Sequence, residues 1–260
     1  PRLSVDIDLT YIPIESRKVS LENIHQSLEN ISTRLNKVLP EANVNHKKEV
    51  SKLLISTREA EIKLEVNLVG RGMLGEAQKK MLSDKTAEEY EAFVSIQVVP
   101  FGQLYGGKIC AALDRQHPRD LFDVKYLLEN EGLSREVMIG FLLALVSHER
   151  PMHEVLNPNL LDQTKAMDNQ FIGMTHQNFD YSDFEEVRSK LVASVNKNLA
   201  EEDKKFLISV KNLNPLWEIH NFEKFPAVRW KLQNLEKLQK SNPQKHKKQT
   251  DLLQKHLDTV

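Results

Sequence analysis

Residues 3–10 read Leu-Ser-Val-Asp-Ile-Asp-Leu-Thr, and this stretch decides how the first part of the chain folds. Its apolar and polar residues alternate, a period of two that is typical of a β-strand with one buried face. Asp6 and Asp8 lie two residues apart, so their carboxylates project from the same face of that strand. The sequence therefore predicts a strand at 3–9 whose polar face carries two neighbouring acids.

The residues that follow predict a small sheet and one long helix. Apolar residues recur at three- and four-residue steps over 21–38, which indicates an amphipathic helix with Ser20 as its N-cap and Pro40 close to its end. Further strands are expected at 50–57, 61–68 and 94–99.

Beyond Pro100 helical patterns take over from strand patterns. Helices are expected at 101–113, 118–131, 134–147, 164–173, 183–199, 201–212 and within 217–238. The expected fold class is therefore α+β, with a small mixed β-sheet core flanked by helices at 1–116 and an all-helical domain at 117–260. Trp217 and Trp230 lie among apolar residues, so we expect them in the helical core rather than as stacking platforms for bases.

Composition excludes several classes of protein. The 260 residues carry a formal net charge of −1, which argues against a nucleic-acid coat protein but allows a local basic groove. Cys110 is the single cysteine, so no internal disulfide is possible and a reducing compartment is expected. The sequence shows no signal peptide and no apolar run long enough for a membrane span. These observations predict a cytoplasmic protein that does not bind a membrane.

The last part of the chain is rich in lysine. Residues 237–260 contain six Lys and two Asp. A solvated helix that frays is the simpler interpretation of this tail, and an arm that contacts the phosphates of a nucleic acid is the alternative.

The paired acids at the start of the chain suit metal binding. Two carboxylates this close repel each other unless a cation lies between them. Hard divalent ions such as Mg²⁺ prefer oxygen ligands of this kind, and such ions can clamp the attacking and leaving oxygens of a phosphoryl transfer. Glu65, on the polar face of the 61–68 strand, is the best candidate for a third acid, although Glu61 shares that face. A pair of surface acids at a strand end is the alternative.

A second cluster of charged residues extends from Lys108 to Asp123. Lys108 lies at the edge of an apolar helical face, where its ammonium could hold a nucleotide triphosphate as a point charge. Asp120 and Asp123 share one face of the next helix, and Arg119 precedes Asp123 by four residues. The alternative is a surface lysine beside an i,i+4 pair worth roughly a few tenths of a kcal/mol.

These motifs together resemble a known family. Residues 3–10, residues 62–67 and the segment from Leu104-Tyr-Gly-Gly-Lys108 to Arg119-Asp-Leu-Phe-Asp123 are similar to the AbiEii/AbiGii toxin family, which belongs to the DNA polymerase β-like nucleotidyltransferase superfamily. Residues 226–232 resemble its C-terminal region, so the resemblance covers nearly the whole chain. It implies a nucleotidyltransferase fold with an appended helical domain.

The resemblance also implies a function. Members are toxins of bacterial toxin–antitoxin systems, some tied to abortive phage infection, so a cognate antitoxin is an expected partner. It implies a Mg²⁺-dependent enzyme that transfers a nucleotide from a nucleoside triphosphate to an acceptor, expected to be RNA such as tRNA.

The resemblance assigns roles to individual residues. It implies that Asp6 and Asp8 ligate Mg²⁺ with Glu65 as the third carboxylate, and that Lys108 contacts the triphosphate. Asp120 matches a second essential acid, which orients Lys108 or the substrate. The same motif contains Arg119 and Asp123, which are assigned to substrate binding.

One feature of the superfamily is not found in these residues. A Gly-Gly or Gly-Ser loop, whose N–H groups cradle phosphate, precedes the first aspartate by about ten residues in the superfamily. Only five residues precede Asp6 here, so we expect this loop to lie upstream of Pro1. The alternatives to the RNA-directed enzyme are a non-catalytic protein that binds nucleotide or antitoxin on the same fold, and a nucleotidyltransferase that acts on a small molecule.

Overall fold

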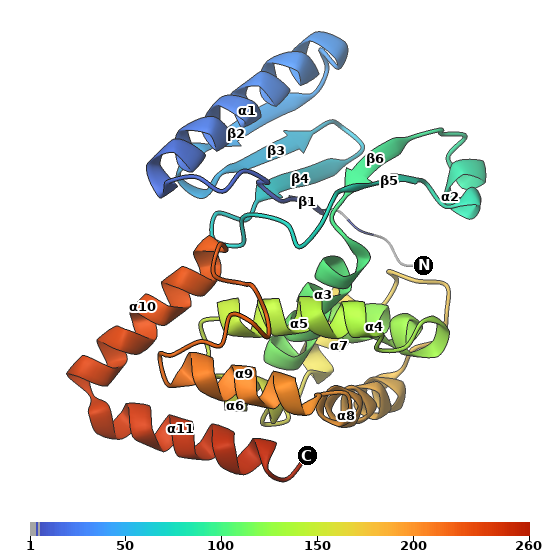
Figure 1. Cartoon of the computed structure of the whole chain (residues 1–260). Helices are drawn as coiled ribbons and strands as arrows, with labels where there is room; N and C mark the ends of the chain where they lie inside the picture. Colours follow the sequence, from blue (N-terminus) through green and yellow to red (C-terminus); the bar gives the residue numbers. More distant parts are fainter. Residues whose placement is uncertain (1–3, 5) are drawn as a thin grey trace. The chain divides into compact units, whose positions relative to one another are not determined.

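The computed structural model describes residue 4 and residues 6–260 (Figure 1). The chain forms two compact units. Unit 1 comprises 1–72, 172–178 and 223–230, and unit 2 comprises 73–171, 179–222 and 231–260. The fold class is α+β, as the sequence predicts. The domain boundary expected between residues 116 and 117 stays a prediction.

The centre of unit 1 is a four-stranded mixed sheet with a long helix on one face (Figure 1). β1 runs parallel to β4, and β4–β3 and β3–β2 are antiparallel, so the strand order is β1-β4-β3-β2. The elements are β1 (Asp6–Leu9), α1 (Arg17–Val38), β2 (Asn43–Lys47), β3 (Lys52–Ser56) and β4 (Glu61–Val66), with a single 3₁₀ turn at Lys48–Val50.

The core of unit 1 explains why one face of the sheet is polar. Ile24 and Leu28 of α1 pack against Leu53 of β3 and Leu64 of β4, and all four are buried. Burial of each such side chain stabilises the fold by about 1.5–3 kcal/mol. Because neighbouring residues on a strand point to opposite faces, the charged residues that flank Leu64 are directed away from α1.

In unit 1 the structure corrects the expected start of the long helix and shows one strand that the sequence does not predict. α1 begins at Arg17, because the Ser16 hydroxyl accepts a hydrogen bond from the Val19 N–H and caps the helix. Ser20, the expected N-cap, lies inside the helix and is buried. β2 is not evident from the sequence, because Val44 is its one apolar residue. Leu3 and Val5 of the expected first strand lie outside the described residues.

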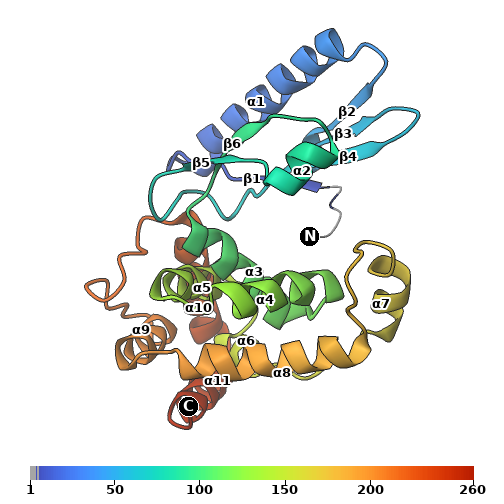
Figure 2. The same ribbon diagram turned by 90° about the vertical axis from the view of Figure 1, so that its right-hand side faces the viewer.

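A hairpin opens unit 2 (Figure 2). β5 (Gln78–Met81) pairs antiparallel with β6 (Ser95–Val98), and α2 (Asp84–Glu89) lies in the connection between them. The strand expected at 94–99 is therefore present, but in the described part of the chain it pairs with β5 and not with the main sheet. β5 and α2 are not among the elements that the sequence predicts.

Helices make up the rest of unit 2. α10 (Pro226–Ser241) begins in unit 1 and ends in unit 2. The other helices are α3 (Phe101–Arg115), α4 (Pro118–Asn130), α5 (Arg135–Ser147), α6 (Met152–Leu156), α7 (Thr164–Gln170), α8 (Tyr181–Lys197), α9 (Glu201–Lys211) and α11 (Pro243–Leu257). None of the helices that the structure describes is long and apolar enough to span a membrane.

Helices α3 and α5 cross at very short distance because glycines meet at the crossing. A Cβ atom on Gly106 of α3 would lie 2.2 Å from backbone atoms of Gly140 and Phe141 in α5. A Cβ atom placed on Gly107, the next residue, would have no neighbouring atom within 4 Å. The first glycine of the Gly106-Gly107 pair is thus required for helix packing.

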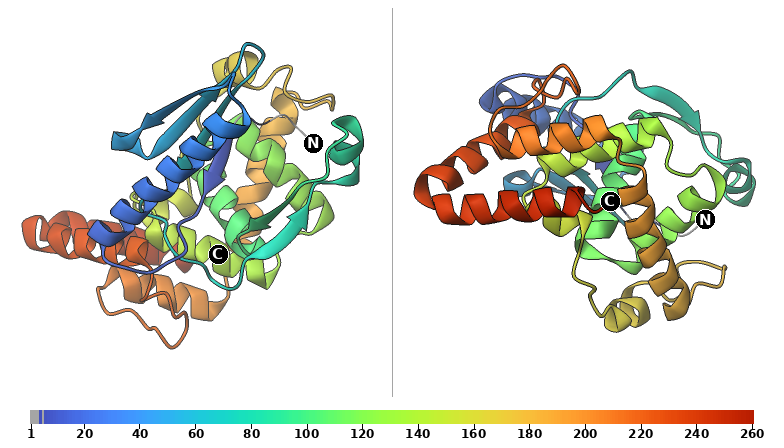
Figure 3. Two further views of the ribbon diagram at one scale, coloured as in Figure 1. Left: turned by 90° about the horizontal axis from the view of Figure 1, so that it is seen from above. Right: turned by 60° about the horizontal axis from the view of Figure 1, so that its bottom comes forward.

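The C-terminal tail is a packed helix. α11 lies beside α6 and α9 within unit 2 (Figure 3), with His246, Leu253 and Leu257 buried. The expectation of a fraying tail is therefore wrong for this face of α11. Trp217 is half-buried and packs against the buried Phe206 at a ring separation of 6.1 Å, so it lies at the edge of the core. Trp230 is 56% exposed, so the expected core position is wrong for it.

Candidate active site

The candidate metal ligands lie on the polar face of the sheet in unit 1. In the parallel pair β1–β4, Asp6 is opposite Lys63 and Asp8 is opposite Glu65. Directly paired residues of neighbouring strands project to the same face. Asp6, Asp8 and Glu65 therefore share the face opposite α1.

Two lysines pair with Asp6 and Glu65 on this face. The Lys63 ammonium lies 3.2 Å from Asp6 Oδ1 and 3.6 Å from Glu65 Oε2, and so bridges acids of two strands. Lys52 Nζ, from β3, lies 2.6 Å from the same Glu65 oxygen. The hydrogen bond to Asp6 raises the pKa of Lys63 above its ordinary value. Carboxylates of β1 and β4 thus converge on one cation, and oxygen donors of this kind also suit Mg²⁺.

The distances on this face do not form a closed metal site. Among residue 4 and residues 6–260, no group of three or more His, Cys, Asp and Glu side chains is spaced to hold a metal ion. The side chains of Asp6, Lys63 and Glu65 are each about one third exposed, at 32%, 32% and 29%. Ion pairs exposed to this degree cost little to open.

The charged motif of unit 2 lies on α3 and α4. Lys108 Nζ of α3 lies 2.6 Å from Asp123 Oδ2 of α4. Asp120 instead accepts two hydrogen bonds from Arg115, at 2.7 and 3.1 Å. The resemblance implied two alternative roles for Asp120, one of which was to orient Lys108. In the structure, Asp123 makes the contact with Lys108.

The turn between α3 and α4 sets the position of these residues. Gln116 ends α3 in the left-handed region at φ 50°, and it is buried with hydrogen bonds to Asn159 and Leu161. The His117 side chain then caps α4 by accepting from the Arg119 N–H, with Pro118 in the first turn. The sequence predicts this helix start correctly, and the turn places half-buried Arg119 beside Asp120 at the beginning of α4.

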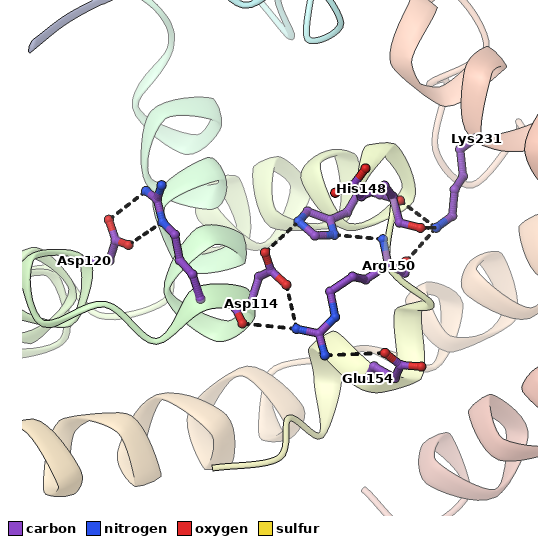
Figure 4. Close-up of polar contacts among 8 residues, drawn as sticks. Asp114, Asp120, His148, Arg150, Glu154 and Lys231 are labelled. Atoms are coloured by element: carbon purple, nitrogen blue, oxygen red, sulfur yellow. Dashed lines mark hydrogen bonds and ion pairs between the residues drawn. The ribbon is translucent and has the colours of Figure 1, made fainter. Parts of the chain in front are cut away.

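A further charged network in unit 2 is not evident from the sequence (Figure 4). Asp114, one turn after Cys110 on α3, accepts a hydrogen bond from Arg150 Nη1 at 2.7 Å and lies 3.4 Å from His148 Nε2. The hydrogen bond to Asp114 raises the pKa of Arg150, and burial lowers the pKa of His148. This network ties the end of α3 to the segment that follows α5. Its partners lie more than thirty residues apart, so no local pattern indicates it.

Comparison with known proteins identifies the family. The family described as "Nucleotidyl transferase AbiEii toxin, Type IV TA system" matches residues 1–234, and the chain belongs to this family. The resemblance seen in the sequence is thereby confirmed, and with it the general function of a nucleotidyltransferase toxin with an antitoxin partner. No curated protein and no solved structure matched the chain.

Proposed function

We propose that this protein transfers a nucleotidyl group from a nucleoside triphosphate to a hydroxyl of an RNA acceptor, such as tRNA, in a Mg²⁺-dependent reaction. The observation that carries the proposal is the position of the Lys63 ammonium between Asp6 and Glu65, because it shows that acids of two strands converge on one cation. Family membership supplies the reaction class.

The proposed metal ligands are three acids of unit 1. Asp6 and Asp8 of β1 and Glu65 of β4 offer oxygen ligands from one face of the sheet. When bound there, Mg²⁺ would neutralise charge on the triphosphate and favour attack at its α-phosphorus. The strands hold the acids in register, so the ligands are pre-positioned by the backbone.

The lysine of α3 fits the anionic substrate. Lys108 is 34% exposed and its ammonium is held by Asp123, so it can exchange this carboxylate for a phosphate oxygen. Asp120 is proposed as the second essential acid, and its pair with Arg115 fixes its orientation. Arg119, at the start of α4, is proposed to contact the substrate.

The reaction balances without an oxidant or reductant. The acceptor hydroxyl oxygen bonds to the α-phosphorus, the bond from that phosphorus to the bridging oxygen breaks, and pyrophosphate leaves. The hydroxyl proton passes to a carboxylate of the acidic face.

An RNA acceptor is supported by the basic surface of the C-terminal helix. Lys245, Lys247 and Lys248 of α11 are exposed, and the same helix buries its apolar residues, so its lysines are displayed on a fixed surface. Such a surface contacts phosphates irrespective of sequence.

The test is label transfer. The protein is incubated with each α-labelled nucleoside triphosphate, total RNA and Mg²⁺, and we expect label in RNA. Asp6→Ala should lower transfer by on the order of 10³-fold, a loss typical of a group that stabilises transition-state charge. Asp168→Ala, which removes an exposed acid of α7, should leave transfer unchanged.

Each arm of the test bears on a different part of the proposal. Retained transfer in Asp6→Ala would contradict the metal site. Label on a small molecule but not on RNA would contradict the acceptor. Nucleotide binding without any transfer would favour the non-catalytic alternative. Expression of the wild type should arrest growth, and expression of Asp6→Ala should not.

A further inference from the structure

Two lysines of unit 2 are buried without an acid partner. Lys211, the last residue of α9, is 4% exposed, and Lys231 of α10 is 6% exposed. Within the described part of the chain, no carboxylate lies within ion-pair distance of either ammonium. A buried charge without an opposite charge beside it is destabilised, because it has lost its hydration shell and gained no ion pair in return. Such a pair requires an explanation.

The hydrogen bonds of the two ammonium groups differ. Lys231 Nζ donates to the backbone oxygens of His148 at 2.6 Å and Arg150 at 2.7 Å, with Glu149 O at 3.5 Å (Figure 4). Its three N–H donors are thus directed to carbonyls that follow α5. Lys211 Nζ donates to Gln249 Oε1 at 2.9 Å, and this accounts for one of its three donors. Lys211 therefore has donor capacity for a ligand.

Both lysines line the same small cavity. Its volume is about 10 Å³, which is room for one water molecule or one small ion. The wall contains no acid and is formed by Pro151, Met152, His153, Lys211, Lys231, Leu235, Gln249 and Leu253. The cavity lies among α6, α9, α10 and α11 and belongs entirely to unit 2.

The electrostatic potential in this cavity is positive, because two lysines line it. Burial lowers the pKa of Lys211 to about 8, and burial together with the Lys211 charge lowers that of Lys231 to about 8. Both therefore remain mostly protonated at pH 7. Burial also lowers the pKa of His153, with the Glu154 carboxylate opposing this effect and the Lys211 charge adding to it. Glu149 and Glu154 act on Lys231 from a greater distance, and Glu154 is already paired with Arg150 at 3.4 Å.

We propose that this cavity binds a monatomic halide, chloride in the cell, through the free donors of Lys211 and in the field of Lys231. A water molecule would satisfy donors of Lys211 but would not neutralise its charge. A monatomic anion is the smallest ion that supplies the missing negative charge, and a cavity of about 10 Å³ has room for a particle of that size. Because the cavity lies among four helices, the ion would fasten α11 to the body of unit 2.

The proposal is tested by stability in different anions. Thermal unfolding is measured at pH 7 and fixed ionic strength in sodium chloride and in sodium gluconate, whose anion is too large for the cavity. We expect a saturable rise of the unfolding midpoint in chloride by about 2–4 °C, the shift expected for a modest gain in a chain of this size. Bromide should replace chloride, and the ³⁵Cl NMR line should broaden in the presence of the protein.

A matched pair of variants assigns the effect to the cavity. Lys211→Met replaces the ammonium by an apolar group of similar length and should abolish both the chloride dependence and the ³⁵Cl broadening. Lys205→Met removes an exposed lysine of the same helix and should keep both.

The outcomes separate a bound ion from a bound water. Equal midpoints in chloride and gluconate for the wild type, without line broadening, would overturn the proposal and leave water in the cavity. Loss of the chloride effect in Lys205→Met as well would show a general surface effect and also overturn it. If Lys211→Met fails to fold, anomalous scattering from wild-type crystals grown in bromide decides, since a peak beside Lys211 supports the site and its absence refutes it.

Discussion

The charged face of the sheet in unit 1 and the buried charged groups of unit 2 use the same chemical groups for different purposes. In unit 1 the pair Lys63–Asp6 is about one third exposed on both sides, at 32% each. In unit 2 Asp203 is fully buried, with Arg135 Nη2 at 2.8 Å and His220 Nε2 at 2.7 Å. The first pair can exchange its cation, and the second cannot.

The difference follows from the solvent. An ion pair in contact with water gains little and costs little to open, so a lysine there can give way to a metal ion or a phosphate. A buried carboxylate that loses its partners keeps the full cost of desolvation. The charged groups of the sheet face are therefore suited to ligand exchange, whereas the buried charged groups of α5 and α9 stabilise the fold.

The largest effect that we expect concerns Asp203. Asp203→Ala leaves Arg135 and His220 without their acceptor, and the free energy of unfolding should fall by about 3–5 kcal/mol. Asp6→Ala, which removes an acid about one third exposed, should lower it by less than about 1 kcal/mol. Urea denaturation followed by circular dichroism measures both. Similar losses in the two variants would break the contrast between the regions.

Gly106 and Gly107 of α3 test the packing of α3, the helix that carries Lys108, against α5. Gly106→Ala places a methyl group against the backbone of α5 and should cost about 1–3 kcal/mol, the usual range for overpacking. Gly107→Ala meets open space, and removal of a helical glycine should stabilise by up to about 1 kcal/mol. Thermal unfolding of the two variants compares the same substitution at adjacent residues. If Gly106→Ala stabilised the protein as Gly107→Ala is expected to do, the crossing of α3 and α5 would not be tight.

The stability of the protein in acid should depend on the buried acid Asp203. Burial by itself raises the pKa of Asp203, but hydrogen bonds from His220 and Arg135 outweigh this, and the pKa lies well below its ordinary value. A depressed folded-state pKa means that the stabilisation is present above the pKa of an unfolded aspartate, about 3.9, and is lost as the pH falls below it. In Asp203→Asn this loss should be absent, so stability should fall less steeply between about pH 5 and pH 2 than in the wild type. Denaturation at a series of pH values measures the slope, and unchanged slopes would contradict the assignment.

The smallest effect that we expect concerns the exchange of Lys63 for a metal ion on the polar face of the sheet in unit 1. Lys63→Met removes the cation that bridges Asp6 and Glu65, so Mn²⁺ should bind about two- to fivefold more tightly, as expected for the release of exposed ion pairs. Titration followed by electron paramagnetic resonance of free Mn²⁺ measures this. Lys18→Met, which removes an exposed lysine paired with Glu22, is the control and should bind Mn²⁺ as the wild type does. Weaker binding in Lys63→Met would mean that this lysine assists the metal rather than competes with it.

Several features of the protein are determined by the sequence alone. The alternation around Asp6 and Asp8 predicts a strand with both acids on one face, and β1 confirms the strand over its described residues. His117-Pro118 predicts the start of α4, because a side-chain cap and a proline in the first turn act locally. The motifs from Lys108 to Asp123 identify the family, which the match over residues 1–234 confirms.

Other features are decided by the tertiary structure. The sequence places Lys108 near three charged residues of α4, but the approach of α3 to α4 selects Asp123 as its partner. Strand register brings Lys63 opposite Asp6, and helix packing buries Lys211 without an acid. The physical reason is range: periodicity and capping act over a few residues, whereas ion pairs and cavities depend on segments that meet only after the chain has folded.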